Sequence, residues 1–105
     1  MTPPPTPTPA LPAAPGGLSA TRVCKTLLGP PPHLEMTNAV LSWNDKADNE
    51  AGYNIYRDGS LIATLDPDSE SFTDADPPGL DHTYWVEAFN EAGSSNQKKI
   101  DVACP

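Results

Sequence analysis

The segment 83–89 alternates between two sets of side chains, and this alternation restricts the fold more than any other feature of the sequence. One set is Tyr84, Val86 and Ala88, and the other contains Trp85. A β-strand points successive side chains to opposite faces, so a period of two indicates a strand with one buried face. No stretch has the 3.6-residue apolar spacing of an amphipathic helix of useful length. The sequence therefore predicts an all-β protein.

Further segments have the length and composition of short strands. In chain order they are 18–23, 38–43, 53–57, 61–65, 71–73 and a last one around Ile100 and Val102. Asp58-Gly59 separates two of them, and this dipeptide favours a type I′ hairpin turn, which needs positive φ at both central residues. Seven short strands predict an antiparallel sandwich of two sheets, in which each strand buries one face.

The first fifteen residues, MTPPPTPTPALPAAP, hold seven of the fourteen prolines and no charged residue. Such a composition cannot bury a core and favours extended polyproline conformations. We therefore expect a flexible linker over residues 1–15 and one domain over residues 16–105. Pro-Thr repeats are typical of spacers in secreted proteins, so we expect a secreted or cell-surface protein whose partners are neighbouring domains of the same polypeptide.

All charged residues follow the proline-rich start, so the formal net charge of −8 belongs to the predicted domain. Phosphate backbones and anionic lipid would repel this surface, and the few bases form no stripe, so we expect no nucleic-acid partner. The start lacks the basic and apolar regions of a signal peptide, and no apolar run is long enough to cross a bilayer. We expect no membrane insertion.

From about residue 15 to residue 105, the pattern resembles a fibronectin type III domain. The segment Leu41-Ser42-Trp43 matches the family's second strand with its inward Trp, and 52–57 is similar to the third strand. The sixth strand's spacing, Tyr-x-Val-x-Ala-x-Asn-x-x-Gly, begins here at Tyr84. The segment Phe72-Thr73-Asp74 with the following Pro78-Gly79 looks more like bacterial modules than animal ones. A proline-rich insertion, Lys25–Leu34, departs from the pattern, and Gly29-Pro30-Pro31-Pro32 within it is expected to interrupt the first strand.

The resemblance implies a seven-strand, immunoglobulin-like β-sandwich. Tyr84 would be the tyrosine-corner residue, with its hydroxyl bonded to the backbone just upstream. The implied structural core comprises Leu41, Trp43, Tyr53, Ile55, Phe72, Tyr84, Val86 and Ala88.

Two cysteines, Cys24 and Cys104, suggest a disulfide in an extracellular module, and the alternative is a pair of buried thiols. The implied topology brings both to the pole opposite the linker, which favours the bridge. The same topology places the two Asn-Glu-Ala-Gly copies, 49–52 and 90–93, at the linker's pole. Because different sequences follow them, we interpret them as two turns and not as an internal repeat.

The sequence contains no recognisable catalytic or metal-binding pattern. His33 and His82 have no matched nucleophile, so we expect no enzymatic activity in this domain and no cofactor. Asp66, Asp68 and Glu70 alternate as in a calcium loop, but the loop's glycine and its bidentate Glu are missing, so we expect no metal site. A second acidic group, at the linker's pole, consists of Asp45, Asp48, Glu50 and Glu91, which we interpret as solvated loop residues or as a surface for a basic partner.

Three aromatic residues, Tyr56, Trp85 and Phe89, are expected to point away from the core on neighbouring strands. Exposed aromatic side chains can mark an interaction site, but they can also simply pack against cross-strand neighbours. We therefore predict a non-catalytic, monomeric spacer or interaction module with a protein or polysaccharide as a further partner. The alternative is a carbohydrate-binding module that uses this aromatic face.

Overall fold

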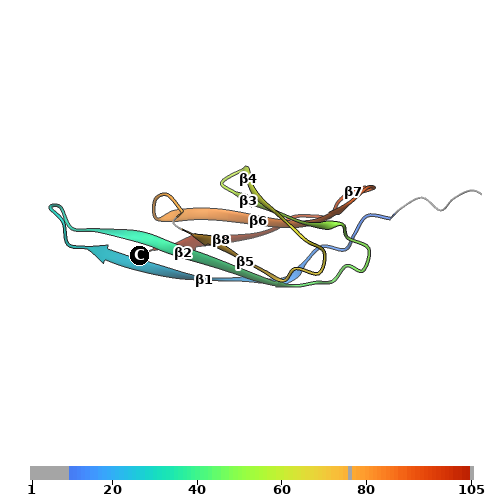
Figure 1. The fold of residues 1–105 in the computed structure, drawn as a ribbon, viewed down its shortest axis with the longest axis horizontal. Helices are drawn as coiled ribbons and strands as arrows, with labels where there is room; N and C mark the ends of the chain where they lie inside the picture. Colours follow the sequence, from blue (N-terminus) through green and yellow to red (C-terminus); the bar gives the residue numbers. More distant parts are fainter. Residues whose placement is uncertain (1–9, 76, 105) are drawn as a thin grey trace, which may run out of the picture.

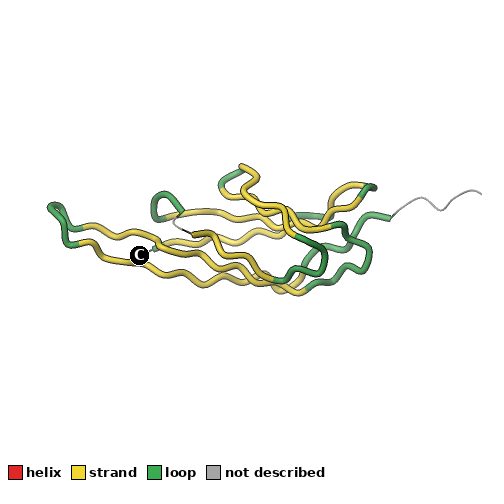
Figure 2. Tube along the Cα trace, in the orientation of Figure 1, coloured by secondary structure: helices red, strands yellow, loops and turns green. Residues whose placement is uncertain are grey.

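The structure is a computed structural model that describes residues 10–75 and 77–104 of the 105-residue chain. Strands joined by loops make up this part of the molecule, as Figure 2 shows. The strands are β1 (Gly16–Leu27), β2 (His33–Asn44), β3 (Gly52–Arg57), β4 (Ser60–Leu65), β5 (Ser71–Ala75), β6 (Asp81–Asn90), β7 (Gly93–Ser94) and β8 (Lys98–Ala103). No helix long and apolar enough for a membrane span occurs among the described residues.

The strands form two antiparallel sheets that face each other (Figure 1). One sheet has three strands in the order β1-β2-β5. The other has five, in the order β4-β3-β6-β7, with β8 also paired to β6. The predicted immunoglobulin-like sandwich is confirmed. The described residues contain eight strands instead of seven, because the short β7 pairs with the end of β6 at Phe89 and Asn90.

The core lies between the two sheets and is formed by the inward side of each strand. Of the eight residues expected there, all except Phe72 are buried. Phe72 is partly buried and packs against the core from β5, which is an edge strand of its sheet. Trp43 and Tyr53 meet across the core with their ring centroids 5.6 Å apart. Met36, Ala39, Val102 and Cys104 complete the buried apolar cluster.

A turn lies where the sequence predicts the interruption, but the wider departure expected over Lys25–Leu34 is wrong, because most of that segment is paired. β1 continues to Leu27 and β2 begins at His33, and the two strands remain paired up to this point. Only the intervening residues 28–32 form the turn, which lies at the far end of the molecule from residue 10 (Figure 1). The reason is that the prolines fall within the turn itself, where a missing N–H costs the ladder nothing.

The hairpin turn predicted at Asp58-Gly59 is confirmed. It joins β3 to β4, with φ of 51° at Asp58 and 92° at Gly59, as a type I′ turn requires.

Candidate functional site

The three aromatic residues singled out in the sequence lie on the outer face of the five-stranded sheet. Tyr56 on β3 is directly opposite Trp85 on β6, and Phe89 is opposite Gly52. All three side chains are partly buried. Their side chains point outward because successive residues of a strand face opposite sides, and the adjacent residues Ile55, Val86 and Ala88 are buried in the core.

Tyr56 and Trp85 belong to a row of side chains that crosses four strands. Strand register places Leu61 of β4 opposite Tyr56, and Lys99 of β8 opposite Trp85. Leu61 is 55% exposed, and Lys99 is also exposed. We call Leu61, Tyr56, Trp85 and Lys99 the transverse row. It presents apolar and aromatic surface with one positive charge at its end.

Glu87, next to the transverse row on the same outer face, is only 6% exposed. Four side chains donate hydrogen bonds to its carboxylate at 2.9–3.2 Å: Asn54, Tyr56, Ser94 and Gln97. Burial by itself would raise the pKa of Glu87, but these donors hold its pKa below the ordinary value. Burial, together with the same carboxylate, raises the pKa of Tyr56. The alternation in the sequence did not reveal this network.

Phe89 has a different environment from the other two aromatics. Its ring lies over Gly52, where an added Cβ would come within 3.0 Å of the ring and 2.3 Å of the Leu65 carbonyl oxygen. Gly52 therefore has no room for a side chain, and Phe89 covers the backbone that it leaves bare. Phe89 therefore has the cross-strand packing role that was the alternative to ligand binding for these aromatic residues.

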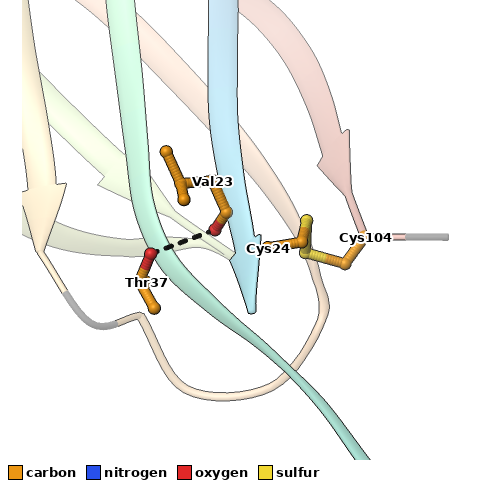
Figure 3. The surroundings of a disulfide bond; sticks show 4 residues. All are labelled: Val23, Cys24, Thr37 and Cys104. Atoms are coloured by element: carbon orange, nitrogen blue, oxygen red, sulfur yellow. Dashed lines mark hydrogen bonds between the residues drawn. A yellow bond between two sulfur atoms is a disulfide. The ribbon is translucent and has the colours of Figure 1, made fainter. Parts of the chain in front are cut away.

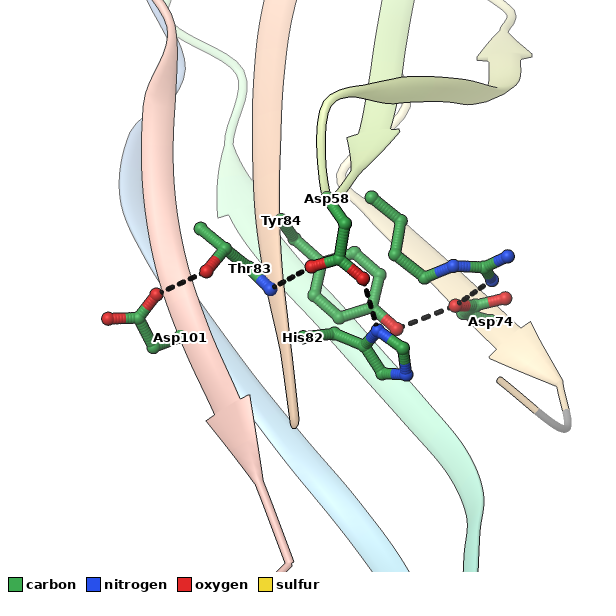
Figure 4. Close-up of polar contacts among 7 residues, drawn as sticks. Asp58, Asp74, His82, Thr83, Tyr84 and Asp101 are labelled. Atoms are coloured by element: carbon green, nitrogen blue, oxygen red, sulfur yellow. Dashed lines mark hydrogen bonds and ion pairs between the residues drawn. The ribbon is translucent and has the colours of Figure 1, made fainter. Parts of the chain in front are cut away.

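Near the β3–β4 turn, charged side chains form two connected pairs (Figure 4). The His82 Nδ1 atom lies 2.6 Å from one oxygen of the Asp58 carboxylate, and the Thr83 backbone N–H donates to the other at 2.9 Å. The bonds from Thr83 and then His82 lower the pKa of Asp58. In the second pair, Arg57 donates to Asp74 at 2.7 Å. The first pair fastens the β3–β4 turn to β6, and the second fastens β5 to β3.

The expected tyrosine corner takes another form. The ring of Tyr84 is buried in the core, but its hydroxyl donates to the Asp74 carboxylate at 2.6 Å instead of to a backbone carbonyl (Figure 4). Burial and this carboxylate raise the pKa of Tyr84 far above its ordinary value. A charged side chain accepts a hydrogen bond more strongly than a neutral carbonyl, and the Arg57 guanidinium compensates the charge of Asp74.

The two histidines show no catalytic pairing within the described residues. His82 is 7% exposed, and its Nε2 atom is buried without a hydrogen-bond partner. His33 lies in the β1–β2 hairpin, beside the Pro31 carbonyl and 3.5 Å from the Glu35 carboxylate. Neither ring contacts a hydroxyl or thiol that it could activate as a nucleophile.

Of the predicted acidic group, Asp45 and Glu50 lie together, while Asp48 and Glu91 are exposed and outside the cluster. Asp68 from the β4–β5 loop joins Asp45 and Glu50, and one carboxylate oxygen of each lies within 4.8 Å of the others. Of the three acids of the calcium-like pattern, only Asp68 belongs to this group. We call Asp45, Glu50 and Asp68 the acidic cluster.

Protein donors already bind the acidic cluster. The Tyr53 hydroxyl donates to Asp45 at 2.5 Å, and the Asp68 backbone N–H donates to Glu50 at 3.0 Å. Burial opposes ionisation of Asp45, but hydrogen bonds led by the one from Tyr53 hold its pKa below the ordinary value. The cluster thus ties the β2–β3 and β4–β5 loops together through local hydrogen bonds.

A disulfide joins Cys24 to Cys104, with 5.9 Å between their Cα atoms (Figure 3). Cys24 lies in β1, at the edge of the three-stranded sheet, and Cys104 directly follows β8 of the other sheet. Beside the bridge, the Thr37 hydroxyl donates to the Val23 carbonyl at 3.3 Å. The bond therefore connects the two sheets of the sandwich covalently.

At the other pole, residues 10–15 lie against the domain although the sequence assigned them to the linker. Asn49 and Asn90 each donate a side-chain hydrogen bond to the Ala10 carbonyl, at 3.0 and 2.8 Å. Pro12 and Pro15 are buried. The two Asn-Glu-Ala-Gly copies thus meet at one pole, as expected, and their asparagines share a partner. Residues 1–9 of the expected linker lie outside the described residues.

No family model and no curated protein matches this chain. Among solved structures, it is similar to the Clostridium perfringens spore cortex lytic enzyme SleM, with a TM-score of 0.65 and 20% identity over 89% of this chain. It is also similar to a structure described as "FN3tt mut", with a TM-score of 0.61 and 21% identity over 90% of this chain and 97% of the other.

The fold is that of a fibronectin type III domain. The resemblance seen in the sequence is confirmed at this level. The chain spans 28% of the cortex lytic enzyme, so only part of that larger protein is similar to it. A fold of this type hosts many unrelated roles, and function must be argued from the residues described above.

Proposed function

We propose that the chain is a non-catalytic, monomeric module of a secreted bacterial multidomain protein, and that it positions the domains on either side of it. The observation that carries this proposal is that both ends of the described chain are attached to the domain, at opposite poles. Ala10 is bonded to the domain at one pole, and Cys104 is covalently bonded at the other (Figure 1). Domains attached to such ends would be held apart by the length of the sandwich.

The disulfide supports an extracellular setting, because thiols stay reduced in most cytosolic environments. The similarity to one part of a larger enzyme supports a modular context. The histidines without nucleophiles support a non-catalytic role.

A free-thiol count on the unfolded, unreduced protein, with intact mass before and after reduction, tests this setting. We expect no free thiol and a gain of about two hydrogens on reduction of a protein with one disulfide. Two free thiols in protein exported to an oxidising compartment would contradict the extracellular assignment. Hydrolysis of a polysaccharide or peptide by the purified chain would contradict the non-catalytic assignment.

A second candidate function, polysaccharide binding, is favoured by the transverse row. Half-buried Tyr56 and Trp85 lie side by side, and sugar rings stack on such aromatic faces. Trp85 is one of two tryptophans, and the other, Trp43, is buried in the core. Fluorescence can therefore report on the face.

The test is a fluorescence titration with soluble fragments of peptidoglycan, chitin and cellulose. If the face binds a glycan, the fragment changes the emission of the unmodified chain, and Trp85→Phe removes most of this change. If no fragment changes the emission, the positioning role stands alone. A change that persists in Trp85→Phe would exclude the transverse row as its cause.

A further inference from the structure

The Ala10 carbonyl receives two hydrogen bonds from side chains that lie 41 residues apart in the sequence. A carbonyl oxygen has two lone pairs, and Asn49 and Asn90 each donate to it. The Asn90 amide also donates to the Asn49 backbone carbonyl at 3.2 Å. The two asparagines and Ala10 are therefore connected by one hydrogen-bond network.

The loops fix the two asparagines independently of residues 10–15. The Ala51 backbone N–H donates to the Phe89 carbonyl at 2.7 Å, which joins the first Asn-Glu-Ala-Gly copy to the strand that leads into the second. The Ala92 N–H donates to the Asn90 side-chain oxygen at 2.8 Å, so the Asn90 amide group is turned outward. The Asn90 donor is thus oriented by its own loop, and the loop that carries Asn49 is held against the end of β6.

Apolar contacts continue from the hydrogen bonds toward β1. The Leu11 side chain lies 3.1 Å from the position that a Cβ on Gly93 would occupy, and Gly93 has a φ of +135°. Pro12 is buried, and Pro15 is among the most completely buried side chains of the chain. Pro12 and Pro15 therefore pack against the domain, while the side chains of Leu11 and Ala13 remain exposed.

The prolines explain why side chains, and not a neighbouring strand, bind this segment. A proline-rich segment lacks an N–H group at each proline and favours an extended conformation without internal hydrogen bonds. It therefore cannot join a sheet edge by a regular ladder. Its carbonyl oxygens remain free acceptors. Asparagine amides can supply the donors that a neighbouring strand would otherwise provide.

We propose that Asn49 and Asn90 form a clamp that recognises an extended proline-rich strap, residues 10–15, and so sets the direction in which the preceding chain leaves the module. This deepens the positioning role proposed above and rests on it for its biological purpose. The strap removes six residues, about 20 Å of extended chain, from the free length of the linker. The duplicated Asn-Glu-Ala-Gly sequence thereby has a shared role at this pole.

The clamp is tested by the double variant Asn49→Asp and Asn90→Asp in the full chain. Aspartate has the shape of asparagine and keeps the oxygen that accepts from Ala92, but its carboxylate cannot donate to the Ala10 carbonyl. The measurement is the ¹⁵N order parameter of the Leu11, Ala13 and Ala14 amides. Asn96→Asp is the control, because Asn96 is exposed and its side chain has no hydrogen-bond partner in the described part of the chain.

We expect order parameters near those of rigid backbone, about 0.85, in the unmodified chain and in the Asn96 control, and values below about 0.6 in the double variant. Low values in the unmodified chain, or unchanged values in the double variant, would overturn the clamp. Elastase, which cleaves after small residues, should cut the strap only in the double variant.

If the double variant fails to fold, Asn49→Asp alone tests the same strap while leaving the Asn90 loop intact, and it should lower the order parameters of the Ala13 and Ala14 amides. Unchanged order parameters in that variant would overturn the proposal. The outcome can be told apart from that of the proposed function. Glycan binding or turnover by the chain would revise the function and leave the clamp standing. A mobile strap would remove the clamp and the attachment at Ala10, but not the non-catalytic, disulfide-bonded module.

Discussion

Tyr56 donates a hydrogen bond to Glu87 at 3.0 Å on the outer face of the five-stranded sheet. One aromatic residue of the transverse row is thus fixed by a buried carboxylate, and its hydroxyl is already used. The ring is held beside Trp85 instead of rotating freely, since Asn54 and Gln97 also hold the carboxylate in place. Any ligand would meet a preformed surface whose polar groups are largely satisfied.

Replacing Glu87 by Gln should destabilise the domain at pH 7 by roughly 1–3 kcal/mol. The carboxylate accepts from four side chains, and an amide nitrogen would face at least one of these donors without an acceptor. The folded-state pKa of Glu87 lies below its unfolded value of about 4.5, so its stabilisation is present above that pH and is lost as the pH falls through the folded pKa.

Urea unfolding of both proteins at pH 7, 5 and 3 measures this effect. The difference in free energy of unfolding between the original protein and Glu87→Gln should be large at pH 7 and 5 and should shrink at pH 3. If the difference in free energy of unfolding does not depend on pH, the network stabilises the fold through the packing of its side chains and not through the charge of Glu87.

Replacing Asp58 by Asn should keep the β3–β4 turn but weaken its attachment to β6. Asn-Gly suits a type I′ turn at least as well as Asp-Gly, so the backbone is unaffected. The half-exposed Asp58 carboxylate has a lowered pKa, so its contribution is present above about pH 3.8 and disappears as the pH falls through the folded value.

We expect a loss of at most about 1 kcal/mol at pH 7, because solvent screens this pair, and nearly equal stabilities of the two proteins at pH 2. Thermal unfolding at both pH values measures the difference. A variant more stable than the original at pH 7 would show that the contact with His82 is unfavourable.

Strand positions and the turn could be predicted because they depend on local chemistry. The period of two over 83–89 and the Asp-Gly dipeptide at 58–59 each specify a backbone conformation without reference to distant residues. The Cys24–Cys104 pairing followed from strand order, once the resemblance supplied the topology. These features required no knowledge of side-chain packing.

Other features depend on side chains that meet only in three dimensions. Glu87 is polar and occupies an outward position, so its burial could not be read from the alternation. Residues 10–15 have the composition of a linker, and their docking depends on two asparagines far along the chain. Asp68 joins Asp45 through loops whose conformations the sequence did not specify. Proline at 30–32 was interpreted as an interruption, although it forms the tip of a longer hairpin.

Replacing Asp68 by Asn should stabilise the domain at low salt. Asp68 has a φ of 67°, which asparagine adopts as readily, and the change removes one of three neighbouring carboxylates. Two unit charges 4–5 Å apart repel by about 1 kcal/mol in bulk water, so we expect a gain of up to that size that fades as salt rises to about 0.5 M.

Asp66→Asn is the matched control, because it makes the same change in net charge in the same loop but lies outside the acidic cluster. Denaturant unfolding at two salt concentrations compares the two variants. An equal gain in both would assign the effect to net charge, and a loss in Asp68→Asn alone would contradict mutual repulsion in the cluster.

Removing the disulfide by Cys24→Ala with Cys104→Ala should lower the free energy of unfolding by about 4 kcal/mol, because the bond closes a loop of 80 residues in the unfolded chain. Small domains usually have 5–15 kcal/mol in total, roughly, so the double variant should unfold at a clearly lower denaturant concentration. Reduction of the original protein should give a similar loss. Unchanged stability in both cases would show that the bond constrains the folded state unfavourably.

The same bond determines how the module responds when the polypeptide is pulled from both sides. Tension passes from residue 10 along β1 to Cys24, and there it crosses the two sulfurs to Cys104. The 80-residue span between the cysteines carries no force while the bond is intact. Its contour length of about 280 Å therefore cannot be extended. Of the described residues, 10–24 can be drawn out, which is roughly 50 Å when fully extended. The oxidised module is therefore a short tether of limited extension, and reduction would turn it into a long one.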